Sequence, residues 1–117
     1  MKNILVIEDT STEAFVIKEA LKGFNVTLVT SSEEAKAKLQ QQKPDLILTD
    51  VVLPGESGFE LCRHLKDDPT TADIPIVICS TKDSDMDKFW GQKQGAVEYL
   101  TKPIDPNQLA MAVKLHA

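Results

Sequence analysis

The sequence has little of what marks a secreted or membrane-spanning protein. Its two cysteines, Cys62 and Cys79, are too few for a disulfide framework and lack the CxxC spacing of a zinc site. No apolar run approaches the about 18 residues that a membrane span needs, and the runs Ile4–Ile7 and Ile76–Cys79 have four residues each. We therefore expect a cytoplasmic protein without membrane insertion, in which both cysteines are buried as small apolar residues.

The sequence also has fewer basic than acidic residues. Thirteen Lys and Arg residues stand against eighteen Asp and Glu residues, which gives a formal net charge of −5. A domain that grips nucleic acid by its phosphates needs a broad basic face, so we expect no direct nucleic-acid binding. The 42% of hydrophobic residues suffice for a core, and 117 residues are the length of one domain, residues 1–117.

Short apolar runs rich in β-branched residues alternate with segments that are long enough for one helix each. The runs predict five strands, at Ile4–Ile7, Val26–Val29, Leu46–Leu48, Ile76–Cys79 and Val97–Leu100. Three of the runs contain no polar residue, as is typical of strands covered on both faces. Five strand–helix repeats with right-handed crossovers predict an α/β fold: a flavodoxin-like, doubly wound parallel sheet of five strands in the order 2-1-3-4-5, with helices on both faces.

Capping patterns mark four helix starts in the segments between the strands. They are Thr10 with Glu13, Ser31 with Glu34, Ser57 with Glu60, and Asp105 with Gln108 after Pro106. Met86 and Trp90 are four residues apart, the spacing of one helix face, which favours a core position for Trp90 in a further helix over an exposed contact with a partner.

Polar and charged residues collect where the predicted strands end. They are Glu8 and Asp9 after the first strand, Asp50 after the third, Ser80 and Thr81 at the fourth, and Lys102 after the fifth. The carboxyl ends of parallel strands share one edge of the sheet, and ligands bind there where the winding direction reverses. Each residue alone has an ordinary explanation in a helix start or a turn, but their occurrence together favours a functional site.

Three carboxylates and one lysine at one site would leave a net charge of about −2, which a low dielectric tolerates only with shifted protonation or a bound cation. All-oxygen ligands favour Mg²⁺, or Mn²⁺, over zinc, with Asp9, Asp50 and the backbone carbonyl of Val52 as ligands. With a metal and Lys102 to neutralise an incoming phosphoryl group, Asp50 can act as its nucleophile, and the Ser80 hydroxyl can donate to a phosphoryl oxygen. The predicted reaction is phosphoryl transfer to Asp50.

Several motifs surround these residues. They are Ile4-Leu-Val-Ile-Glu-Asp9, Pro44-Asp-Leu-Ile-Leu-Thr-Asp50, Leu53-Pro-Gly55 followed by Gly58, Pro75-Ile-Val-Ile-Cys-Ser80, Gly95-Ala96 and Tyr99-Leu-Thr-Lys-Pro103. Together they span nearly the whole chain, which resembles the receiver domain of bacterial two-component response regulators, in particular the single-domain chemotaxis type. The segment Phe89–Ala96 is similar to the same region in single-domain regulators of cyanobacterial pilus motility and phototaxis.

The resemblance implies a phosphorylation site with defined roles. Asp50 would accept phosphate from a histidine kinase or phosphotransfer domain, and Lys102 would bind the phosphate. Glu8 and Asp9 would hold Mg²⁺ together with Asp50 and the Val52 carbonyl. The bond between Lys102 and Pro103 would be cis.

The resemblance also implies a switch. Ser80 would move toward the phosphate and Tyr99 would turn inward, which would remodel the face of the last two helices and the fifth strand for a downstream protein target. Two positions depart from the family pattern. Val52 stands where the chemotaxis type has an amide that orients water, and Thr81 stands where many members carry Ala, so we expect slow self-dephosphorylation.

Two other functions remain open at this stage. One is a phosphate-independent interaction domain that keeps the fold. The other is an aspartate-nucleophile phosphohydrolase, although that class usually has a second Asp where this chain has Val52. The complete set of acidic residues, hydroxyl and lysine favours a signalling domain rather than an enzyme.

Overall fold

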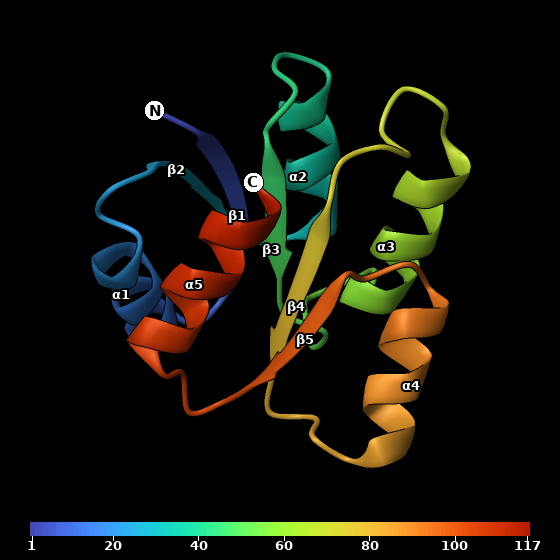
Figure 1. Ribbon diagram of the computed structural model, residues 1–117. Coiled ribbons are helices and arrows are strands. Elements are labelled where there is room, and N and C mark those ends of the chain that lie inside the picture. Colours follow the sequence, from blue (N-terminus) through green and yellow to red (C-terminus); the bar gives the residue numbers. More distant parts are fainter.

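Five parallel strands form one central sheet in the order β2-β1-β3-β4-β5, as a computed structural model of residues 1–117 shows (Figure 1). The strands are β1 (Asn3–Ile7), β2 (Asn25–Val29), β3 (Leu46–Thr49), β4 (Ile76–Ser80) and β5 (Glu98–Thr101). The flavodoxin-like topology predicted from the sequence is confirmed, and no predicted strand boundary is displaced by more than one residue.

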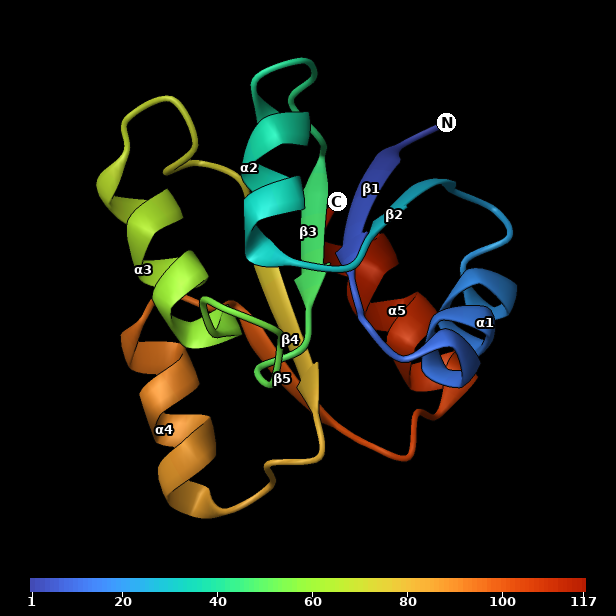
Figure 2. The same ribbon diagram turned by 180° about the vertical axis from the view of Figure 1, so that it is seen from behind.

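Helices cover both faces of the sheet. They are α1 (Ser11–Ala20), α2 (Ser32–Leu39), α3 (Gly58–Asp67), α4 (Asp85–Lys93) and α5 (Pro106–His116). Figures 1 and 2 show α1 and α5 together on one face and the other three helices on the opposite face. No helix is both long enough and apolar enough to cross a membrane.

Each face of the sheet has its own hydrophobic core, which explains why the central strands are apolar throughout. Successive residues of a strand point to opposite faces, so Ile4 and Val6 join the core that α1 and α5 cover, while Leu5 and Ile7 join the core on the other side. Both cysteines are buried as expected, Cys62 in one core and Cys79 in the other.

The side chains of Ser31, Ser57 and Asp105 cap their helices as predicted, because each accepts a hydrogen bond from a backbone N–H in the first turn. Thr10 stands at the start of α1, but its side chain makes no capping hydrogen bond. The backbone N–H of Thr10 donates to Glu8 Oε2 at 3.3 Å, and Glu13, its expected capping partner, reaches Lys102 instead.

The expected core position of Trp90 is wrong. Trp90 is 46% exposed, and Met86 on the same helix is 71% exposed. Helix α4 turns Gly91 toward the sheet, where a Cβ atom would lie only 2.7 Å from Tyr99 Cδ2. The tyrosine ring occupies the place of a side chain at position 91, and the large apolar residues of α4, Phe89 among them, remain on the outside.

Candidate functional site

Three carboxylates meet at the carboxyl ends of neighbouring strands. Glu8 and Asp9 follow β1, and Asp50 follows β3, which is paired with β1 in parallel. One carboxylate oxygen of each residue lies within 4.8 Å of the others. Glu8 and Asp50 are buried whereas Asp9 is exposed, so the cluster has one side open to solvent.

Lys102 brings the only ammonium group into this cluster. Its backbone N–H donates to the Ser80 carbonyl at 2.9 Å, just beyond the last paired residues of β4 and β5. Its Nζ lies 2.7 Å from Glu8 Oε1 and 2.9 Å from Asp50 Oδ2. The peptide bond to Pro103 is cis, as the sequence resemblance implied. The strand ends thus bring Glu8 and Asp50 into direct contact with the lysine, and Asp9 lies beside these two carboxylates.

Glu13 is a further member of the cluster that sequence reasoning assigned to a helix cap. It lies in the first turn of α1, and its Oε2 is 2.7 Å from Lys102 Nζ. The only signal in the sequence was that Glu13 falls in the first turn of the helix that starts directly after Glu8 and Asp9. The pattern also fitted a capping box with Thr10, so it could not identify the partner.

The charges of the site do not cancel. Burial raises the pKa of Glu8, while the hydrogen bond and positive charge of Lys102 act in the opposite direction. Burial by itself would lower the pKa of Lys102, but its hydrogen bonds to Asp50, Glu13 and Glu8 outweigh burial and raise that pKa. One ammonium group, held in its charged form, therefore faces four carboxylates when Asp9 is included.

The backbone around Asp50 fixes the direction of its carboxylate. Oδ1 accepts from the Val51 N–H at 2.7 Å and from the Val52 N–H at 3.3 Å. Gly58, at the start of α3, packs against this backbone so closely that a Cβ atom would lie 2.0 Å from the Asp50 carbonyl oxygen. Val52 follows on the surface and is 56% exposed.

Ser80 and Tyr99 both contact the backbone of Lys82, in the loop between β4 and α4. The buried Ser80 Oγ accepts from the Lys82 N–H at 3.2 Å, and the Tyr99 hydroxyl donates to the Lys82 carbonyl. Burial, together with the negative charge of Asp87, raises the pKa of Tyr99 to about 12, so the phenol remains a donor. Thr81, which lies between Ser80 and Lys82 in the chain, is exposed.

A sequence model of the response regulator receiver domain matches residues 4–114. The chain belongs to the response regulator receiver family. Protein PilH of Pseudomonas aeruginosa is 39% identical to this receiver over 115 residues, which cover 97% of the receiver and 95% of PilH. The phosphate regulon transcriptional regulatory protein PhoB of the same organism is also 39% identical over 115 residues, but the receiver spans only 50% of PhoB.

Solved structures of other response regulators have the same fold. The chemotaxis response regulator CheY4 of Vibrio cholerae is 27% identical and superposes with a TM-score of 0.91. The superposition covers 100% of the receiver and 99% of CheY4. The Mn²⁺-bound form of response regulator Rcp1 is 29% identical, with a TM-score of 0.83 over 97% of the receiver and 90% of Rcp1. The resemblance to the chemotaxis-type receiver domain is therefore confirmed.

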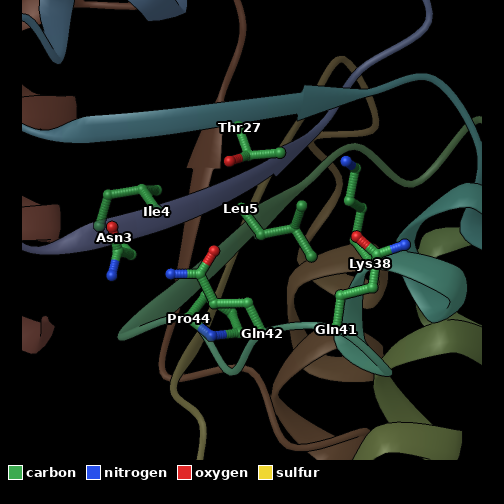
Figure 3. Close-up of a pocket in the computed structure, with 8 residues that line it drawn as sticks. All are labelled: Asn3, Ile4, Leu5, Thr27, Lys38, Gln41, Gln42 and Pro44. Carbon is green, nitrogen blue, oxygen red and sulfur yellow. The ribbon is translucent and has the colours of Figure 1, made fainter.

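The receiver also has a hollow of about 380 Å³ (Figure 3), and no residue of the acidic cluster lines it. It is lined by Asn3, Ile4, Leu5, Thr27, Lys38, Gln41, Gln42 and Pro44. These residues come from the first part of β1, the middle of β2, the last turn of α2 and the segment between α2 and β3. None of the predicted site residues lines this hollow. These residues lie instead at and beyond the carboxyl ends of the strands.

Proposed function

We propose that this receiver accepts a phosphoryl group on Asp50 from a histidine kinase or phosphotransfer domain and thereby controls binding of a downstream protein in the cytoplasm. The observation that carries the proposal is the contact of one lysine, Lys102, with Asp50 and Glu8 at 2.9 Å and 2.7 Å, beside the exposed Asp9. In this role the chain is a signalling protein that participates in its own phosphorylation rather than an enzyme acting on other substrates.

The donor set fits a hard divalent cation. Carboxylate oxygens within 4.8 Å of one another, a negative excess, and access to solvent at Asp9 suit Mg²⁺, with Mn²⁺ as a substitute. Glu8, Asp9, Asp50 and the carbonyl of Val52 would hold it. The bound cation would neutralise charge on the phosphoryl group during transfer.

The residues of this chain would carry the transfer as follows. A carboxylate oxygen of Asp50 attacks phosphorus, the bond from phosphorus to the donor breaks, and the donor leaves with that electron pair. The N–H groups of Val51 and Val52 keep the carboxylate aligned. Lys102 offsets the charge of the phosphoryl oxygens, and the Ser80 hydroxyl donates to one of them.

The signal would pass from Ser80 to Tyr99. Both residues contact Lys82, so a movement of Ser80 toward a phosphoryl oxygen would disturb the residue that anchors the tyrosine hydroxyl. The readout would be the face of α4, β5 and α5. Support comes from exposed apolar side chains, Trp90 on α4 and Met111 and Leu115 on α5, and from an open groove of about 840 Å³ along β5 and α5.

Slow self-dephosphorylation is part of the proposal. Hydrolysis needs a water molecule held in line with the phosphorus atom, and the apolar side chain of Val52 offers it no hydrogen bond. Val52 and Thr81 are both exposed, and beside a phosphoryl group on Asp50 their side chains would limit the approach of water. Both would therefore act as modulators of the phosphoryl lifetime.

The test is the intact mass of the protein after incubation with acetyl phosphate, with and without Mg²⁺. We expect wild type to gain one phosphoryl group only with Mg²⁺, and Asp50→Asn to gain none. Failure of wild type to gain mass would favour a phosphate-independent interaction domain, which would bind its partner equally well as wild type and as Asp50→Asn. Steady turnover of a phosphate ester would instead favour the phosphohydrolase.

A further inference from the structure

The hydrogen bonds of the Lys102 ammonium are fully used. An ammonium group has three N–H donors and no acceptor. The Nζ of Lys102 lies 2.7 Å from Glu8 Oε1, 2.7 Å from Glu13 Oε2 and 2.9 Å from Asp50 Oδ2. The side chain is only 4% exposed, so these carboxylates, rather than water, satisfy it. A fourth acceptor can bind this ammonium only if one of the three leaves.

The three partners of Lys102 differ in how easily they leave. The side chains of Glu8 and Asp50 are 1% and 9% exposed, so separating either from the lysine would leave a buried, unpaired carboxylate. The side chain of Glu13 is 32% exposed, and its carboxylate can exchange the lysine for water at a much smaller cost. Glu13 is therefore the exchangeable partner.

We propose that Glu13 is a positioning residue that occupies Lys102 in the unphosphorylated receiver and opposes the phosphorylated state. The inference rests on the proposed phosphorylation of Asp50 and assigns the residue that competes with it. A phosphoryl group on Asp50 brings new anionic oxygens to the lysine, and Glu13 must yield its place. In a second arrangement, the phosphoryl oxygens replace Asp50 Oδ2 on the ammonium and Glu13 keeps its contact. The negative charge of Glu13 then lies beside the negative phosphoryl oxygens, and this repulsion also disfavours the phosphorylated state.

The test compares Glu13→Gln with wild type in binding beryllofluoride, an anionic analogue of the phosphoryl group, by calorimetric titration. Mg²⁺ is held at a saturating concentration that is determined separately for each variant. We expect Glu13→Gln to bind beryllofluoride about two- to fivefold more tightly. Wild type must break the ion pair between Glu13 and Lys102 when the anion binds, whereas the variant has no such pair, and a partly exposed pair is worth this modest amount. A residue with a merely structural role would weaken binding when changed.

Glu19→Gln is the matched control. It removes the same charge from the same helix, but Glu19 pairs with Lys22 on the surface at 3.0 Å and not with Lys102. We expect its affinity to equal that of wild type. Equal or weaker binding by Glu13→Gln, or equal gains in both variants, would overturn the role of Glu13 while leaving the proposed function intact. No binding by wild type would overturn both.

Discussion

At the scale of single residues, Lys102 holds the acidic cluster together. It is the only positive group in contact with the buried carboxylates of Glu8 and Asp50. Removing one member of a buried ion pair costs about 3–5 kcal/mol, because the other member keeps its charge without compensation. This cost identifies the lysine as a structural residue as well as a ligand for phosphate in the proposed function.

We expect Lys102→Met to lower the free energy of unfolding by about 3 kcal/mol at neutral pH in the presence of a chelator. Urea unfolding measures it. Saturating Mg²⁺ should stabilise this variant more than wild type, because a bound cation relieves the repulsion among the carboxylates that Lys102 otherwise offsets. Lys22→Met, which loses only an exposed pair with Glu19, should change stability by less than about 1 kcal/mol. A similarly small loss for Lys102→Met would contradict the expectation.

Val52 provides a kinetic prediction. We expect Val52→Asn to shorten the lifetime of the phosphorylated protein about tenfold, since one hydrogen bond that aligns the attacking water is worth about 1.4 kcal/mol. The decay of phosphoprotein mass after removal of acetyl phosphate measures the lifetime. Val52→Leu serves as the apolar control and should leave it long. A half-life of seconds in wild type would refute the idea of slow hydrolysis.

Residues of the acidic cluster differ in how far sequence could predict them. Glu8, Asp9 and Asp50 follow strands that apolar runs mark clearly, and parallel pairing then places them at one edge. Glu13 was not predictable in the same way. Its three-residue spacing from Thr10 satisfies a capping box as well as it satisfies a position beside Lys102, and only the contact at 2.7 Å decides between them.

At the scale of elements, α4 owes its start to a capping box that the sequence analysis did not include. Ser84 Oγ accepts from the Asp87 N–H at 3.0 Å, and Asp87 Oδ2 accepts from the Ser84 N–H at 3.3 Å. We expect Ser84→Ala to cost about 1 kcal/mol in thermal or urea unfolding. Thr10→Ala should cost much less, since Thr10 makes no side-chain cap. Equal losses in the two variants would contradict this reading of α4.

Gly91 explains how α4 packs. In the middle of a helix, Gly costs about 1 kcal/mol relative to Ala, but the Tyr99 ring would lie 2.7 Å from an alanine Cβ. We expect Gly91→Ala to destabilise the wild-type protein. It should stabilise a Tyr99→Ala variant by less than about 1 kcal/mol, because the ring is then absent and only the end of the Ile78 side chain, 3.2 Å from the Cβ position, has to move. Urea unfolding of the four proteins measures this coupling. An equal effect of Gly91→Ala in both backgrounds would show that the ring and the helix are independent.

At the scale of the whole molecule, the two cores keep both thiols protonated. Burial raises the pKa of Cys62 to about 11 and that of Cys79 to about 12, from 9.0 in the unfolded chain. The folded state therefore holds these protons more tightly. The stability that they contribute is complete below pH 9.0 and is lost as the pH rises toward the folded values.

We expect the free energy of unfolding to fall between pH 9 and 11 by about 1 kcal/mol per pH unit for each thiol. Urea unfolding along this pH series measures the slope. A protein with both Cys62→Ala and Cys79→Ala should be less stable at neutral pH but should show a flatter slope, since alanine does not ionise. An unchanged slope in that variant would assign the alkaline loss to other groups.

The sequence by itself determined the sheet, its strand order and the edge at which the acidic residues lie. These follow from apolar runs, helix caps and right-handed crossovers, which are local or generic constraints. The tertiary structure alone decided that Glu13 binds Lys102, 89 residues away, and that Tyr99 takes the space beside Gly91 and leaves Trp90 exposed. Local sequence patterns fit a cap or a lysine contact for Glu13, and a buried or an exposed position for Trp90, about equally well. Only contacts between elements distant in the chain decide between them.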